Sequence, residues 1–131
     1  MQKIIILITL LFVLFIARII FLADTGGDSI FFDLGKAVPY GDKVAHFCLY
    51  GLLTLLVNWA FQFRQLSLYR WRPYLGSILV VVFAVLEELS QGWFPTRTLD
   101  IVDLLADAAG ITVFSVISFW LQRTQQRYRE N

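Results

Sequence analysis

Carboxylates and their possible partners are concentrated in two short blocks of an otherwise apolar chain. Residues 42–53 read DKVAHFCLYGLL, and residues 87–110 read EELSQGWFPTRTLDIVDLLADAAG. Both blocks run into segments that are hydrophobic enough to cross a membrane. An ionisable side chain within a membrane is energetically costly and usually faces the interior of a helix bundle or a water-filled cavity. We therefore expect these blocks to supply the functional groups of the protein.

Helical spacing places the polar side chains of each block on one face. Asp42 and His46 are four residues apart, and Glu88 and Gln91 are three apart. The fourth apolar segment carries a stripe at i, i+3, i+7 and i+10, formed by Asp100, Asp103, Asp107 and Gly110. Ala106 and Gly110 lie beside this stripe as a small-xxx-small pair, which allows close packing of a neighbouring helix. The acidic stripe is therefore expected to face inward.

The composition indicates a single membrane domain, residues 1–131. The chain is 58% hydrophobic and 16% charged, whereas soluble domains are roughly 25% charged. Four apolar segments have close to the ~20 residues that a helix needs to cross ~30 Å of hydrocarbon: residues 4–23, 44–63, 74–92 and 101–121. The short turn at residues 93–99 requires its two helices to be antiparallel. We predict an all-α membrane protein, a bundle of four antiparallel transmembrane helices.

Lysines and arginines are distributed unequally between the two predicted faces of the membrane. Seven lie on the side of the N-terminus: Lys3, Arg64, Arg70, Arg72, Arg123, Arg127 and Arg129. Three lie on the other side: Lys36, Lys43 and Arg97. Because basic residues favour the cytoplasmic face, both termini are predicted to be cytoplasmic. No feature of the sequence supports nucleic-acid binding.

Because successive helices run in alternating directions, their polar side chains are expected at a similar depth in the membrane. At ~1.5 Å per residue, Arg18 lies roughly 20 Å up the first helix, and His46 about 6 Å below the outer end of the second. Asp103 and Asp107 lie about 6 and 12 Å into the fourth helix, while Glu88 reaches the outer third of the third. We expect a polar cavity open toward the outer face.

One cluster is predicted within this layer. Its members are His46, Glu88, Gln91, Arg97, Asp100 and Asp103. Arg97 is expected to fold back over the acids as their counter-charge, and His46 to lie within reach of Glu88 or Asp103. Two of the polar residues also have a purely structural interpretation. Arg18 could form an ion pair with an acid, and Asp100 could cap the fourth helix. Glu87 is expected to be structural or at the lipid edge.

The two blocks resemble the signature blocks of VanZ-like membrane proteins. Those blocks run approximately D-K-x-x-H-F and E-x-x-Q-x-x-x-P-x-R-x-x-D-x-x-D-x-x-x-N-x-x-G. The matching positions are Asp42, Lys43, His46, Phe47, Glu88, Gln91, Pro95, Arg97, Asp100, Asp103 and Gly110. Asp107 departs from the pattern, which usually has Asn there. The resemblance implies a multi-pass protein of the bacterial cytoplasmic (inner) membrane, a place in cell-envelope chemistry and a link to resistance to the glycopeptide teicoplanin, but no particular reaction.

Three functions are compatible with these residues. The first is a protein that binds or modifies a polar or anionic envelope molecule: a lipid headgroup, a lipid-linked cell-wall precursor or a glycopeptide. Basic side chains would then bind the anion, namely Arg18, Lys43, Arg97 and protonated His46. The remaining ligand-binding candidates are Asp42, Gln91, Asp100 and Asp107, and the catalytic candidates are His46, Glu88 and Asp103.

The second function is a metal-dependent enzyme that acts on a lipid phosphate. Hard oxygen ligands for Mg²⁺ or Mn²⁺ are available from Glu88, Asp100, Asp103 and Asp107, with His46 as a general base. The third is a small proton- or cation-coupled transporter, because carboxylates that are shielded from water bind protons more readily than usual. The sequence leaves these alternatives open, together with the oligomeric state.

Overall fold

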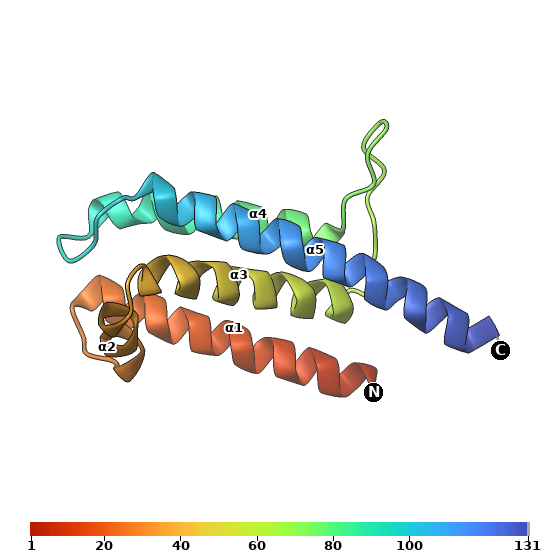
Figure 1. Ribbon diagram of the computed structural model, residues 1–131, viewed down its shortest axis with the longest axis horizontal. Coiled ribbons are helices and arrows are strands. Elements are labelled where there is room, and N and C mark those ends of the chain that lie inside the picture. Colours follow the sequence, from red (N-terminus) through yellow and green to blue (C-terminus); the bar gives the residue numbers. More distant parts are fainter. Residues whose placement is uncertain (131) are drawn as a thin grey trace.

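The computed structural model describes residues 1–130, which contain five α-helices and no strand. These are α1 (Gln2–Thr25), α2 (Ile30–Ala37), α3 (Gly41–Ala60), α4 (Leu75–Ser90) and α5 (Ile101–Glu130), with a 3₁₀ turn at Gln91–Trp93 after α4. Four of them, α1, α3, α4 with its 3₁₀ turn, and α5, are long and apolar enough to cross a membrane. The all-helical prediction and the four apolar segments are confirmed (Figure 1).

Two elements differ from the sequence-based boundaries. The connection at residues 24–43 was expected to be a loop, yet it contains α2, which begins where the Ser29 hydroxyl accepts a hydrogen bond from the Phe31 N–H at 3.3 Å. Ser, Thr, Asp and Asn favour such helix starts because they satisfy a free N–H. Helix α5 continues to Glu130 instead of ending at residue 121. Its polar last turns extend beyond the rest of the bundle (Figure 1).

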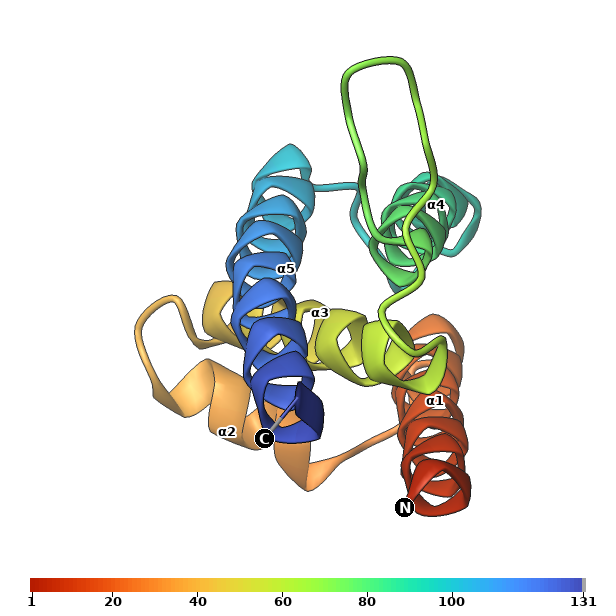
Figure 2. The ribbon, with the colours of Figure 1, turned by 90° about the vertical axis from the view of Figure 1, so that its right-hand side faces the viewer.

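Helix α3 lies at the centre of the bundle and contacts the other four helices. Figure 2 shows α5 crossing α3, with α4 above α3 and α1 below it. The core cluster joins residues of α1, α3, α4 and α5: Ile16, Tyr50, Leu53, Val80, Ala84 and Ile111. The ends of the chain lie toward the same end of the molecule (Figure 1). We call this the proximal end and the opposite one the distal end.

Glycine allows α3 and α5 to approach closely. A Cβ atom at Gly110 would lie 2.2 Å from the Phe47 carbonyl oxygen, and one at Gly51 would lie 2.4 Å from the Phe114 ring. A side chain at Gly110 would require the helices to separate, because the obstacle is backbone, whereas one at Gly51 would require the Phe114 ring to move. The expectation that Gly110 marks a packing face is confirmed, and the same contact brings the acidic stripe of α5 against α3.

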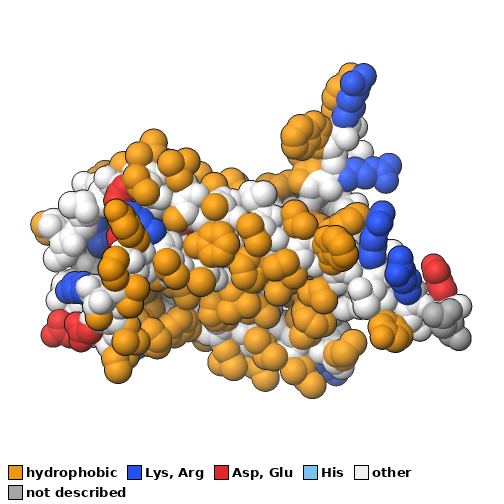
Figure 3. Space-filling model, in the orientation of Figure 1, with side chains coloured by type: hydrophobic (Ala, Val, Ile, Leu, Met, Phe, Trp, Pro, Cys, Tyr) orange, Lys and Arg blue, Asp and Glu red, His pale blue; other side chains and the backbone are white. Residues whose placement is uncertain are grey.

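The surface has the character of a membrane protein. Hydrophobic side chains cover the middle of the molecule, and charged side chains lie toward its two ends (Figure 3). On α1, large apolar side chains including Leu7, Leu11 and Leu14 are more than half exposed. Soluble monomers rarely expose an apolar surface of this kind, whereas lipid would cover it. The loop at residues 64–73 forms a hairpin that projects from the proximal half (Figures 1 and 2).

A group of uncharged polar side chains joins three helices inside the bundle. Asn58 of α3 donates from Nδ2 to the hydroxyl oxygens of Ser77 on α4, at 3.0 Å, and Ser118 on α5, at 3.1 Å. Ser77 and Ser115 share a further hydrogen bond of 2.7 Å. We call these four residues the neutral node. Gly76 makes room for it, since a Cβ there would lie 2.4 Å from Asn58 Oδ1.

Candidate functional site

The distal end brings together the C-terminal ends of α1 and α4 and the N-terminal ends of α3 and α5. The turn between α4 and α5 is tied to α1, because the Thr96 hydroxyl lies 2.9 Å from the Ala23 carbonyl oxygen and 2.8 Å from that of Asp24. This attachment positions Arg97, the next residue, beside the end of α1. Polar side chains from four helices therefore meet in one region.

Lys43, in the first turn of α3, connects that helix to α5. Its ammonium nitrogen lies 2.6 Å from Asp100 Oδ2 and 3.0 Å from Asp42 Oδ2, and it also contacts Asp103. Asp100 caps α5 as well, since its Oδ1 accepts a hydrogen bond from the Val102 N–H at 2.9 Å. The neighbouring Lys43 ammonium, together with the N–H of Val102, lowers the pKa of the Asp100 carboxyl. Asp100 thus combines the expected cap with a place in the site.

His46 lies one turn further along α3, between two carboxylates of α5. Its Nδ1 donates to Asp107 Oδ1 at 2.8 Å, and its Nε2 lies 3.7 Å from Asp103 Oδ2. The imidazole stacks on the Tyr50 ring with centroids 6.0 Å apart. Asp107 is completely buried, and its Oδ2 has no hydrogen-bond partner within residues 1–130. A buried carboxylate with one unsatisfied oxygen is energetically costly.

Glu87 is a buried acceptor at the centre of the region, which agrees with the structural alternative and contradicts the lipid-edge one. Its carboxylate accepts from Arg97 Nη2 at 3.0 Å, from Gln91 Nε2 at 3.0 and 3.2 Å, and from the Tyr50 hydroxyl at 3.3 Å. Arg97 also donates to Asp24 Oδ1 at 2.8 Å. The motif alone could not place Glu87, because its position on the inner face depends on how α4 packs against α3.

Glu88 and Gln91 complete the connection between α4 and α5. Glu88 accepts from the Asp100 N–H at 2.6 Å and from Gln91 Nε2 at 3.0 Å. Gln91, which also donates to Glu87, therefore bridges the two neighbouring glutamates. Both Glu88 and Gln91 are almost fully buried. Their contacts explain how two adjacent carboxylates are accommodated at the end of one apolar helix.

These contacts form one connected set that we call the distal network. It consists of Asp24, Asp42, Lys43, His46, Tyr50, Glu87, Glu88, Gln91, Arg97, Asp100, Asp103 and Asp107. The predicted clustering is confirmed. Arg97 pairs with Asp24 and Glu87, however, and the cation beside Asp100 and Asp103 is Lys43. The hydrogen-bond partner of His46 is Asp107, with Asp103 further away. Their predicted catalytic and ligand-binding roles stay predictions.

Arg18 does not belong to this network. Its side chain is exposed on α1, and it forms no ion pair with any other residue of the described range. Arg97 occupies the place beside Glu87 that Arg18 was expected to fill. Sequence reasoning also missed Asp24 and Tyr50. Tyr50 could have been found because it follows His46 by one helical turn, whereas Asp24 depends on the long-range contact between α1 and the α4–α5 turn.

The four carboxylates predicted as metal ligands are bound by protein donors. Asp100 and Asp103 contact Lys43, Asp107 accepts from His46, and Glu88 accepts from Gln91. Within residues 1–130, no group of three or more His, Cys, Asp or Glu side chains is arranged to hold a metal ion. The described geometry therefore gives no support for the predicted Mg²⁺ or Mn²⁺ site.

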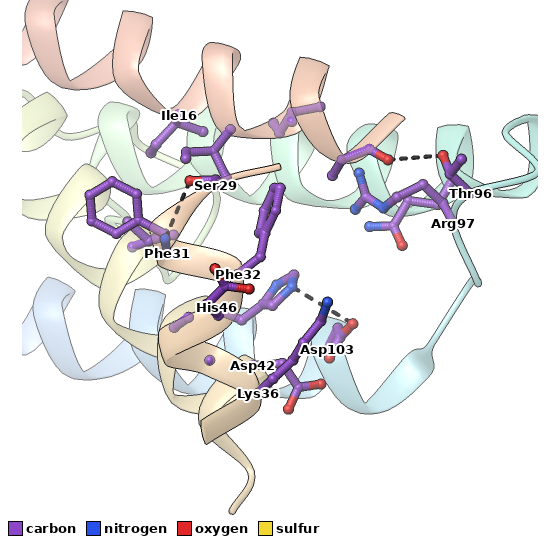
Figure 4. Close-up of a pocket in the computed structure, with 18 of the residues that line it drawn as sticks. Ile16, Ser29, Phe31, Phe32, Lys36, Asp42, His46, Thr96, Arg97 and Asp103 are labelled. Atoms are coloured by element: carbon purple, nitrogen blue, oxygen red, sulfur yellow. Dashed lines mark hydrogen bonds and ion pairs between the residues drawn. The ribbon is translucent and has the colours of Figure 1, made fainter. Parts of the chain in front are cut away.

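A cavity of about 880 Å³ opens beside the distal network. Its polar floor includes His46, Glu87, Gln91, Arg97 and Asp103. Its apolar wall includes Ile16, Ile19 and Ile20 of α1 and Phe31 and Phe32 of α2. Figure 4 shows the charged and aromatic side chains around one space, with Lys36 and Asp42 at its α2–α3 side. The arrangement fits a molecule with one polar and one apolar part.

Comparisons with known proteins give limited information. The chain is 34% identical over 77 residues to an uncharacterized protein of the fission yeast Schizosaccharomyces pombe, and the match covers 58% of this chain and 45% of that protein. The chain thus spans less than half the length of this relative. No family model and no solved structure matches the chain. Membership of the VanZ-like family stays a prediction from the two sequence blocks.

Proposed function

We propose that this multi-pass membrane protein binds the polar headgroup of an amphipathic envelope molecule in the distal cavity. The observation that carries this proposal is the division of the cavity into an aliphatic and aromatic wall and an ionisable floor. Binding sites for small molecules commonly combine such a wall with a few polar groups that fix orientation. The wall would contact the apolar part of the ligand, and the distal network would hold its headgroup.

The charge of the network identifies the chemistry of the headgroup. Seven carboxylates face only two permanently charged cations, Lys43 and Arg97, and both cations already contact carboxylates. Arg18, the third predicted anion ligand, is exposed on α1. The floor consequently offers mainly hydrogen-bond acceptors. Hydroxyl or ammonium groups would satisfy these acceptors, so we propose a sugar- or amine-bearing headgroup in preference to an anion.

The orientation that we propose places the distal cavity outside the bacterial cytoplasmic membrane, with antiparallel helices and both termini in the cytoplasm. The support is the excess of lysine and arginine at the proximal end. In a Cys48→Ser background, an impermeant thiol reagent applied to intact cells should label Asp28→Cys but not Ser67→Cys or Thr124→Cys. Labelling of Ser67→Cys from outside would reverse the orientation.

Lipid binding is best tested with probes that lack phosphate. Native mass spectrometry of the purified full chain should retain diglucosyl diacylglycerol or sphingosine at least about fivefold better than plain diacylglycerol, which corresponds to about one net hydrogen bond. Asp103→Asn should remove this preference. Glu130→Gln, an acid at the proximal end, is the matched control and should keep it. Equal retention of all three lipids by the unaltered protein would refute the proposal.

Proton- or cation-coupled transport is a second candidate, and one observation favours it. Asp107 is fully buried, and its Oδ2 has no partner among the described residues 1–130. Such a group is suited to taking up a proton or a small cation. Proteoliposomes should then show a flux driven by a pH or ion gradient that Asp107→Asn weakens. If no gradient drives a flux, the coupled-transport candidate is rejected and headgroup binding is unaffected.

The link to teicoplanin rests on the sequence resemblance alone. Expression of the unaltered chain in a susceptible bacterium should raise the inhibitory concentration of teicoplanin, whereas His46→Ala should not. An unchanged inhibitory concentration, with the protein present in the membrane, would remove resistance from the proposed role.

A further inference from the structure

A second cavity lies at the proximal end, between the start of α1 and the ends of α3 and α5. It has a volume of about 360 Å³. Aromatic rings and amides form much of its wall, and they include Trp59, Gln62, Phe63, Gln125, Gln126 and Arg129. Among residues 1–130, no Asp or Glu side chain lines this cavity, in contrast to the distal one. We infer that it is a binding site for a phosphate-bearing headgroup, independent of the ligand of the distal cavity.

The hydrogen bonds of the wall leave donors available. Gln122 accepts from the Tyr74 hydroxyl through Oε1 at 2.8 Å, so its amide N–H groups stay free to donate into the cavity. The side chains of Gln62, Gln125 and Gln126 take part in none of the hydrogen bonds within residues 1–130. Together with the guanidinium of Arg129, these amides can surround the oxygens of a phosphate. Arginine binds phosphate in a bidentate manner through paired N–H groups.

The turn after α3 fixes one side of this cavity. Gln62 and Phe63 have φ values of 54° and 55°, a left-handed conformation that residues other than glycine rarely adopt. The Phe63 N–H donates to the Asn58 carbonyl oxygen at 2.7 Å, and the Phe63 ring packs between Trp59 and Tyr74 with centroids 6.4 and 6.2 Å away. These contacts position Phe63 and the turn at one side of the cavity.

The basic residues around the proximal cavity favour the binding of an anion. Seven basic residues occur in the proximal segments of the chain, namely Lys3, Arg64, Arg70, Arg72, Arg123, Arg127 and Arg129, against one acid, Glu130. Figure 3 shows several of these basic side chains beyond the apolar middle of the molecule. Because the cavity lies where this basic end meets the lipid-facing surface, a phospholipid headgroup can reach it. A soluble phosphate ester has the same chemistry, and the experiment distinguishes the two.

Native mass spectrometry of the full chain should detect tighter binding of phosphatidylglycerol than of phosphatidylcholine, because the second lipid carries a cation that offsets its phosphate. Arg129→Gln should weaken phosphatidylglycerol binding about tenfold through loss of a charge-assisted contact. Gln125→Leu, which removes an amide but no charge, should weaken it by a smaller factor. The matched control is Arg123→Gln, because Arg123 lies over the Phe119 ring at 4.4 Å and does not line the cavity.

Addition of glycerol 3-phosphate identifies the natural form of the ligand. Displacement of the lipid by this ester at millimolar concentration would assign the site to a soluble phosphate, and persistence of the complex would assign it to the phospholipid. Equal binding of both lipids, or an equal loss on Arg123→Gln and Arg129→Gln, would overturn the inference, because either result would reflect general attraction to the basic end.

Discussion

The neutral node and the distal network are both polar clusters inside a mostly apolar bundle, but they are built differently. The neutral node contains one amide and three hydroxyls, joined by hydrogen bonds of 2.7–3.1 Å. The distal network contains seven carboxylates and borders a cavity, and within residues 1–130 Asp107 Oδ2 has no hydrogen-bond partner. Saturated hydrogen bonding is sufficient to hold helices together. The distal network also joins helices, but it contains more carboxylates than cations and borders a cavity, which is why we propose it as the functional site.

This contrast predicts that substitutions in the two clusters have different effects on stability and on ligand binding. In the neutral node, loss of a polar group should weaken the fold and leave ligand binding intact. In the distal network, removal of a whole charged pair should be tolerated by the fold, whereas removal of one partner should not. The four experiments below test these statements in order of expected effect.

The largest loss of stability is expected for Arg97→Leu. This change leaves Glu87 buried without its cation and also unpairs Asp24. Removal of one partner of a buried ion pair typically costs 3–5 kcal/mol, and about 3 kcal/mol is expected here because Arg97 is partly accessible. Chemical unfolding in detergent micelles measures the loss. Adding Glu87→Gln should restore much of the stability; if it does not, Arg97 stabilises the fold by some means other than neutralising Glu87.

A smaller loss is expected for Asn58→Leu in the neutral node. The substitution removes the hydrogen bonds to Ser77 and Ser118 while roughly keeping the volume. Interhelical hydrogen bonds in membranes contribute about 0.6–2 kcal/mol, so a decrease of about 1–2 kcal/mol is expected in the same unfolding assay. Binding of diglucosyl diacylglycerol should not change in protein that remains folded. A loss of binding would show that the two clusters are coupled and would break the comparison.

Asp107→Asn should change stability by less than about 1 kcal/mol in either direction, because it removes a buried charge and keeps an oxygen that accepts from His46. The same amide is the residue that VanZ-like proteins usually have at this position. Thermal unfolding of the variant beside the unaltered chain provides the measurement. A strong destabilisation would mean that the Asp107 charge is itself required for helix packing.

The smallest effect is the pH dependence of the stability that Asp100 contributes. Lys43 lowers the pKa of Asp100 in the folded protein, so the ionised carboxylate favours folding above the ordinary aspartate pKa. This contribution is lost as the pH falls through the lowered pKa. The unaltered protein should therefore be more stable than Asp100→Asn at about pH 7, and the difference should shrink as the pH falls below the ordinary aspartate pKa, to vanish only below the lowered pKa. Asn retains the helix-capping ability, so the comparison isolates the charge. A difference that does not vary with pH would contradict the assignment.

The sequence predicted those features that depend on local pattern. Apolar length identified the four long helices, and helical spacing placed His46 and the acids of α5 on inward faces. What the sequence could not supply depends on packing between helices. The partners of Glu87, the separation of Arg18 from the network and the neutral node all follow from how α3 contacts its neighbours. Helix α2 was missed because eight residues within a Gly- and Asp-rich connection give little periodic signal.

The contacts of Lys43 and His46 with α5 have a consequence for biogenesis. Mean hydropathy in the best window is 3.1 for α1 but only 1.2 for α3, so α1 partitions into a bilayer far more readily. Apart from Asp42, the carboxylates that Lys43 and His46 contact lie more than fifty residues later, at the start of α5 and within it. A chain released before α5 would hold α3 in the bilayer with His46 without its carboxylate partners and with Lys43 paired to Asp42 alone. We expect such fragments to be recognised by membrane quality control, and pulse-chase comparison of chains ending at residue 95 and at residue 131 would measure the difference in lifetime.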